Sequence, residues 1–145
     1  IEKLKNYCAL QDKCKWDVKQ KMKEWGLRNK AQDYIIEELI NEKYIDEERY
    51  SRSFCRGKFK IKKWGKMKII NELRKKCVAE ICINKGIEEI SDAEYLKELD
   101  MQYHKKKDSI KEKNYFLRKR KITTYLINKG YESNLVWDQL KELKE

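Results

Sequence analysis

The sequence predicts an all-α protein, formed by three tandem three-helix repeats that stack into an elongated, curved helical array. The 145 residues contain no proline and only five glycines, and 42% of them are charged, a composition that favours helices. Apolar residues recur along most of the chain at helical spacing. The chain also aligns with itself in three copies, which indicates a repeat architecture.

The self-alignment brings one helix end of each copy into register. The aligned positions are Val18, Ile69 and Ile122, then Met22, Leu73 and Leu126, then Gly26, Cys77 and Gly130. Each copy contains a helix that ends near a Gly or Cys, a short turn and a second amphipathic helix. The predicted repeats are residues 1–45, 46–91 and 92–145. Units of this size bury little apolar surface alone, so we expect each copy to pack on its neighbour.

The first copy is expected to form helices over about residues 2–12 and 15–25, followed by a third. Gly26 is suited to end the second helix in the left-handed conformation. Cys14 is a poor N-cap for that helix, whereas Asn29 with Gln32 resembles a capping box for the third. The apolar faces are predicted to contain Leu4, Tyr7, Cys8, Leu10, Val18, Met22, Trp25, Ile35, Ile36, Leu39 and Ile40.

The second copy is expected to form helices near residues 47–61, 66–76 and 80–90, with Asp46 as the first N-cap. Gly86 should weaken the third of these helices by about 1 kcal/mol relative to alanine. In the third copy, Ser91 with Glu94 caps a long helix, Gly130 ends the next, and Ser133 starts the last. Its buried residues are predicted to be Tyr95, Leu96, Leu99, Tyr103, Leu135, Val136, Leu140 and Leu143.

Composition also limits the possible partners. A net charge of +11 and a pI near 9.3 argue for an anionic partner, such as nucleic acid, an acidic protein or an anionic membrane surface. No apolar run is long enough for a transmembrane helix and the first residues lack a signal-peptide pattern, so a cytoplasmic protein is expected. The five cysteines lack a Cys-x-x-Cys pair, which indicates reduced packing residues.

Catalytic patterns are lacking in the sequence. The only histidine, His104, precedes three lysines and suits a solvated helix end. Acidic pairs such as Glu47 and Glu48 resemble capping charges, and no phosphate-binding glycine loop or metal-ligand cluster accompanies them. We therefore expect a protein that is not an enzyme, with no cofactor and no metal site.

Two basic clusters are more informative, at residues 49–68 and 105–121. Between Glu48 and Glu72 no acidic residue occurs, and acidic residues gather instead in 33–48 and 88–100. This segregation favours an anion-binding role over an ordinary solvated surface. The predicted binding residues are Arg52, Arg56, Lys58, Lys62, Lys63, Arg118 and Arg120.

Aromatic residues near these clusters have two possible uses. Helical spacing favours core packing for Tyr44 and Trp64. For Phe59 and Tyr115 the choice between core packing and stacking on nucleic-acid bases stays open.

Three stretches of the chain resemble the RecX family, bacterial regulators of the RecA recombinase. They are the run from Tyr44 to Phe54, Trp64-Gly65 followed by Leu73, and residues 128–133, Asn-Lys-Gly-Tyr-Glu-Ser. The resemblance extends from about Tyr7 to Leu143 and implies three tandem three-helix repeats. Cys14 and Cys77 depart from the Ser-type cap and the helix-ending glycine that are usual in the family.

The resemblance implies a non-enzymatic regulator that lodges in the groove of the RecA filament on single-stranded DNA. It would block filament growth or promote disassembly, and so restrain homologous recombination, ATP hydrolysis and SOS co-protease activity. A monomer with no membrane partner is expected. The alternative is a stand-alone basic helical module that binds single-stranded nucleic acid without a recombinase partner, for which strongly salt-dependent binding to bare DNA or RNA is expected.

Overall fold

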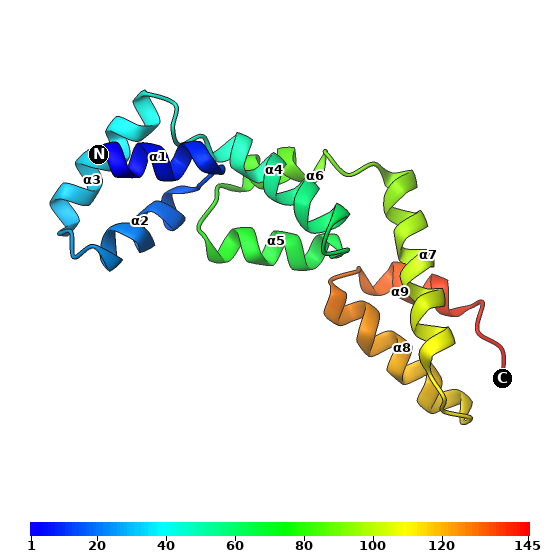
Figure 1. Cartoon of the computed structure of the whole chain (residues 1–145). Coiled ribbons are helices and arrows are strands. Elements are labelled where there is room, and N and C mark those ends of the chain that lie inside the picture. The colour runs from blue at the N-terminus through cyan, green and yellow to red at the C-terminus, as the bar shows by residue number, and fades with distance from the viewer. The chain divides into compact units, whose positions relative to one another are not determined.

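Nine α-helices and no strands make up the computed structural model, which describes all 145 residues (Figure 1). The all-α prediction is therefore confirmed. No helix has both the length and the apolar composition needed to cross a membrane. The helices are α1 (Glu2–Leu10), α2 (Lys15–Glu24), α3 (Asn29–Asn41), α4 (Glu47–Lys60), α5 (Lys66–Lys75), α6 (Glu80–Ile87), α7 (Asp92–Ser109), α8 (Tyr115–Lys129) and α9 (Ser133–Leu140).

The chain divides into two compact units, and α4 and α5 contribute residues to both. Unit 1 consists of Ile1–Cys55 and Glu72–Glu89, and unit 2 consists of Arg56–Asn71 and Ile90–Glu145. The predicted repeat boundaries, after residues 45 and 91, fall between α3 and α4 and between α6 and α7. The division into three repeats stays a prediction.

The aligned helix ends share one backbone conformation. Gly26, Cys77 and Gly130 all adopt positive φ angles, of 73°, 58° and 102°. The following residue donates its N–H to a carbonyl five residues earlier, a pattern typical of helix C-termini. These hydrogen bonds, of 3.0–3.2 Å, are Leu27 to Met22, Val78 to Leu73 and Tyr131 to Leu126.

The predicted N-caps are partly confirmed. The Asp46 carboxylate accepts from the Arg49 N–H at 3.0 Å, and the Ser91 hydroxyl accepts from the Glu94 N–H at 3.1 Å. The capping box at Asn29 is wrong, because Asn29 is already the first residue of α3. Gln32 is buried instead, and its amide donates to the Leu27 carbonyl at 2.8 Å.

The start of α2 compensates for its unsuitable N-cap. Cys14 is fully buried, and its N–H donates to the Asp17 carboxylate at 3.3 Å. The helix begins at Lys15, close to the predicted residue. No cysteine forms a disulfide. Cys8, Cys14 and Cys55 are buried as packing residues, whereas Cys77 is exposed.

The first three helices of unit 1 enclose an apolar core. The predictions for Leu10 and Trp25 are wrong, because these side chains are 88% and 42% exposed. Both lie at helix ends, where helical spacing no longer decides which way a side chain points. The buried members of the core are Leu4, Cys8, Val18, Met22, Ile35, Ile36, Leu39 and Ile45.

The burial pattern of α7, in unit 2, differs from the predicted one. Leu96 is half exposed, whereas Glu98 and Gln102 are buried. The Gln102 amide donates to Glu98 at 3.0 Å and accepts from the Tyr125 hydroxyl at 2.8 Å. Because these polar atoms bond one another, their burial costs little, and hydrophobic spacing alone does not reveal it.

Gly86 has a packing role that outweighs helix propensity. A Cβ at this position would lie 2.3 Å from the Ser51 hydroxyl oxygen and 2.8 Å from the Cys55 sulfur. The propensity cost of Gly86 stays a prediction, but an alanine Cβ here would clash with α4. Glycine allows α6 to approach α4 within unit 1.

Candidate partner-binding surface

Two of the stretches that carry the family resemblance meet in unit 2. The Gly65 N–H donates to the Lys129 carbonyl at 2.7 Å, and the Met67 N–H donates to the Gly130 carbonyl at 2.9 Å. Residues 62–68, which contain the turn after α4 and the first residues of α5, thus lie against residues 128–131, at the end of α8 and just after it. We call these two segments the glycine junction.

Both glycines are needed for this approach. A Cβ on Gly65 would lie 2.2 Å from the Gly130 carbonyl carbon, and a Cβ on Gly130 would lie 2.4 Å from the Lys68 Cβ. Real Cβ atoms do not come so close to other heavy atoms. The left-handed φ of Gly130 adds a second reason for glycine there.

Two buried tyrosines hold the junction in place. The Tyr131 hydroxyl donates to the Lys63 carbonyl at 3.0 Å. The Tyr95 hydroxyl accepts from the Lys66 N–H at 2.9 Å and donates to the Glu132 carboxylate. Burial, and then the hydrogen bond to Glu132, raise the pKa of Tyr95. Because both hydroxyls stay protonated at neutral pH, these hydrogen bonds fix the backbone on which the basic side chains stand.

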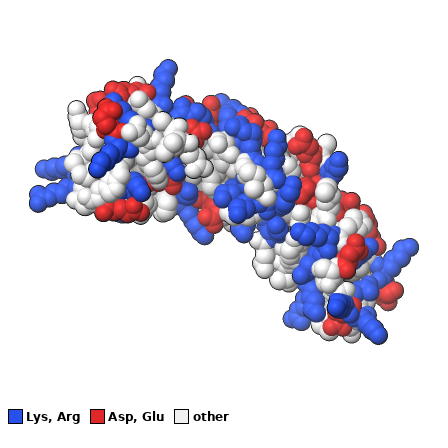
Figure 2. Space-filling view, viewed as in Figure 1, with Lys and Arg blue, Asp and Glu red and all other residues white.

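Lysines crowd around the junction. Lys58 and Lys68 lie over the Trp64 ring, with ammonium groups 4.9 and 4.4 Å from its centroid. Burial lowers the pKa of Lys129, and the nearby charges of Lys105 and Lys68 lower it further. Figure 2 shows Lys and Arg atoms gathered over the end of α4 and the start of α5. The junction therefore forms a concentrated positive surface.

The predicted residues Lys58, Lys62 and Lys63 belong to this surface. Lys62 is exposed, and its carbonyl accepts from the Lys129 ammonium group at 3.1 Å. Lys63 is half-buried, and its ammonium group lies 3.8 Å from Glu98. Arg56, also in unit 2, is exposed on α4.

Arg52 has a different environment, in unit 1. Its guanidinium donates to Glu89 at 3.0 Å and lies 3.8 Å from Glu48. Its charge is largely neutralised by these carboxylates, so the structure gives it a stabilising contact. Its role in binding stays a prediction.

Arg118 and Arg120 lie in the first half of α8, whereas the glycine junction lies at the C-terminal end of this helix. The Arg118 guanidinium donates to the Lys144 carbonyl at 2.8 Å, whereas Arg120 is exposed. The sequence analysis missed Lys129, and it placed Lys68 in the basic cluster 49–68 without naming it among the binding residues. Lys129 could have been found from the sequence, because it precedes Gly130 in the stretch 128–133 that resembles the family.

The aromatic candidates divide between core and surface. Phe59 is buried against Tyr95, with ring centroids 5.9 Å apart, so it is a core residue. Trp64 and Tyr115 are half-buried, and two lysine ammonium groups lie over the Trp64 ring. Tyr44 is half-buried, and it packs against the core of the first three helices.

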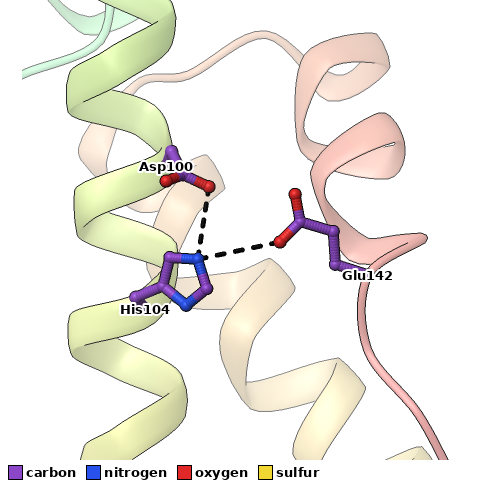
Figure 3. A group of neighbouring side chains, drawn as sticks. All are labelled: Asp100, His104 and Glu142. Atoms are coloured by element: carbon purple, nitrogen blue, oxygen red, sulfur yellow. Dashed lines mark ion pairs between the residues drawn. The ribbon is translucent and has the colours of Figure 1, made fainter.

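A separate group in unit 2 has metal-ligand chemistry. His104 and Asp100 on α7 lie beside Glu142, which follows α9 (Figure 3). Sequence reasoning missed this group because Glu142 is far from the other two along the chain. The spacing of Asp100 and His104, one helical turn apart, was the only signal in the sequence.

Comparison with protein families gives one match within the chain. Residues 46–87, which contain α4 to α6, match the family model for RecX, second three-helix domain. This region includes Trp64 and Gly65 of the glycine junction.

Curated relatives match over nearly the whole chain. The regulatory protein RecX of Bacillus cytotoxicus is 25% identical over 140 residues, which are 97% of this chain and 52% of the relative. The regulatory protein RecX of Bacillus thuringiensis is 21% identical over the same shares. The chain therefore spans about half the length of the curated relatives it matches.

Solved structures show the same fold. A crystal structure of regulatory protein RecX superposes with a TM-score of 0.87 and 20% identity, over 98% of this chain and 71% of that protein. RecX from Lactobacillus salivarius superposes with a TM-score of 0.79 and 20% identity, over 95% of this chain and 90% of that one. Residues 46–87 thus match the second three-helix domain of RecX, and nearly the whole chain is similar in sequence to regulatory RecX proteins.

Proposed function

We propose that this chain is a non-enzymatic inhibitor of a RecA-type recombinase in the cytoplasm. It binds as a monomer in the groove of the recombinase filament on single-stranded DNA, and blocks extension or promotes disassembly. It thereby restrains recombination during DNA repair, ATP hydrolysis and SOS co-protease activity. Similarity to proteins named as regulatory proteins, over nearly the whole chain, supports the regulatory part of this proposal.

The observation that carries the binding part is the uneven distribution of charge. Unit 2 contains 20 basic and 10 acidic residues, whereas unit 1 contains 16 and 15, so nearly all of the net charge lies in unit 2. A positive surface of this kind neutralises phosphates and carries little sequence information. That suits a filament that assembles on any DNA sequence.

The glycine junction is the proposed contact with the filament's DNA. Its backbone is fixed by hydrogen bonds, so Lys58, Lys62 and Lys68 project from an ordered frame. Trp64, half-buried with two lysine ammonium groups over its ring, is the aromatic side chain of the junction nearest these positive charges. The balanced charges of unit 1 suit contact with the protein part of the filament.

The test is the single-stranded-DNA-dependent ATPase rate of the recombinase from the same organism, titrated with substoichiometric amounts of this chain. The variant K58E/K62E/K68E should need about tenfold more protein for half-inhibition, because repulsion replaces attraction to phosphates. The control K3E/K19E/K30E makes the same charge change at three exposed lysines of unit 1. If both variants inhibit the ATPase equally, the glycine junction is not the contact with the filament's DNA.

The alternative, a stand-alone nucleic-acid-binding module, makes a different prediction in the same titration. Inhibition would begin only when the chain covers the DNA, and it would follow affinity for bare DNA measured by fluorescence anisotropy. For bare single strands, replacing three phosphate-contacting lysines should lower the slope of log affinity against log salt by about 2. Inhibition at substoichiometric ratios with weak bare-DNA binding supports the regulator.

A further inference from the structure

We propose that Asp100, His104 and Glu142 form a binding site for a divalent transition-metal ion of the zinc type. The imidazole Nε2 of His104 lies 3.3 Å from an Asp100 carboxylate oxygen and 3.7 Å from a Glu142 carboxylate oxygen. Figure 3 shows both carboxylates directed toward the same ring nitrogen. The site is independent of the proposed function.

The spacing of these atoms fits a tetrahedral ion. Zinc bonds to imidazole nitrogen and carboxylate oxygen are about 2.0–2.2 Å long, which places two ligand atoms of a tetrahedron about 3.3–3.6 Å apart. The two measured distances to the imidazole are close to this range, and all three ligand atoms lie within 4.8 Å of one another. Small rotations of Glu142, a half-exposed side chain, complete the geometry.

The ligands come from elements that the fold already holds together. Asp100 and His104 are four residues apart on α7 and therefore project from one helix face. The Gln139 amide on α9 donates to Asp100 at 2.8 Å and orients its carboxylate. An ion here would join the turn after α9 to α7.

The surroundings also contain an unsatisfied polar atom. Tyr103 is fully buried, its hydroxyl has no hydrogen-bond partner, and its ring contacts the His104 ring edge-on, with centroids 5.0 Å apart. Tyr103 is the residue next to His104, so this hydroxyl lies in the surroundings of the proposed site.

The charges match a divalent ion. Two carboxylates with a neutral imidazole supply two negative charges, which a divalent ion neutralises. Imidazole and carboxylate ligands suit zinc, and three protein ligands leave one position for water or for a side chain of a partner. The lysines that follow His104 repel the ion, so we expect modest affinity.

The chain has a single histidine, so one imidazole signal reports on the site. We would titrate the reduced 145-residue chain with ZnCl2 and follow the His104 ring nitrogens by long-range ¹H–¹⁵N NMR. Coordination should shift the Nε2 resonance at micromolar zinc. Cobalt(II) in place of zinc should give a visible spectrum without thiolate charge-transfer bands, which excludes binding through the cysteines.

Two variants and a control decide the outcome. Glu142→Gln and His104→Ala should weaken binding at least about tenfold, whereas Asp138→Asn, which removes an exposed carboxylate on α9, should leave it unchanged. Because Glu142 lies outside the helices, its variant should fold normally. An imidazole signal that does not move below 1 mM zinc, or zinc binding that is equal in Glu142→Gln, would overturn the site.

Discussion

Units 1 and 2 use the same helix-end pattern but carry very different charge. In unit 1 basic residues are matched by carboxylates, as in the pairs of Arg49 with Asp12 and Lys5 with Glu42, each 2.7 Å long. In unit 2 basic residues outnumber acidic ones two to one, and pairs such as Lys66 with Asp92 are looser, at 3.5 Å. The comparison teaches that buried positions maintain the fold, while the surface of each unit is free to specialise.

The largest expected difference between the units is in the stability lost when a helix-ending glycine is replaced by alanine. Gly26 in unit 1 needs glycine only for its left-handed φ, because a Cβ there would meet nothing within 4 Å. Gly130 in unit 2 needs it for both φ and close approach. We expect Gly130→Ala to cost about 2–5 kcal/mol and Gly26→Ala about 1–2 kcal/mol in urea unfolding.

Hydrogen exchange would show in which segments each substitution lowers stability. Gly130→Ala should speed exchange in residues 62–68 and 128–131, whereas Gly26→Ala should act near α2 and α3. Gly57→Ala, on an open face of α4, is the matched control and should stabilise slightly. Equal costs at Gly26 and Gly130 would show that the backbone contact in unit 2 is unimportant for stability.

A medium effect on stability is expected at Cys77, the aligned helix end after α5 in unit 1. Cys77 adopts a φ of 58°, which is strained for a residue with a Cβ. Cys77→Gly should raise the free energy of unfolding by about 0.5–1 kcal/mol, since relief of strain exceeds the entropy that glycine adds to the unfolded chain. Cys77→Ala keeps the Cβ and should bring no gain; a gain in thermal melting equal to that of glycine would contradict the explanation.

The smallest effect is a difference in the response to salt. Raising KCl from 0.1 to 1 M shortens the Debye length from about 10 to about 3 Å. Unit 2, where Lys68 and Lys105 lower the pKa of Lys129, should gain stability as repulsion is screened. Unit 1 should lose a little as its ion pairs weaken, and both changes should be below about 1 kcal/mol.

Hydrogen exchange measured unit by unit at the two salt concentrations checks this prediction. Lys129→Gln removes one of the crowded charges and should reduce the gain in unit 2 without changing unit 1. If both units respond to salt with the same sign and size, the charge difference between them has no energetic consequence.

Local signals gave correct predictions at several helix ends, although the capping box predicted at Asn29 was wrong. Asp46 and Ser91 accept the expected N–H groups, and Gly130 ends its helix in the left-handed conformation. These interactions extend over three or four residues, so the sequence contains both partners. Buried polar residues such as Gln102 were missed because their partners lie on other helices.

The sequence by itself determined the all-α class, most helix bounds and the excess of positive charge, because each depends on neighbouring residues or on composition. Only the tertiary structure decided that Gly65 meets Gly130, that Arg52 is neutralised by Glu89, and that Glu142 joins His104. These pairs are between 37 and 65 residues apart in the chain. Contacts over such separations depend on how helices pack, and no local pattern of residues encodes that packing.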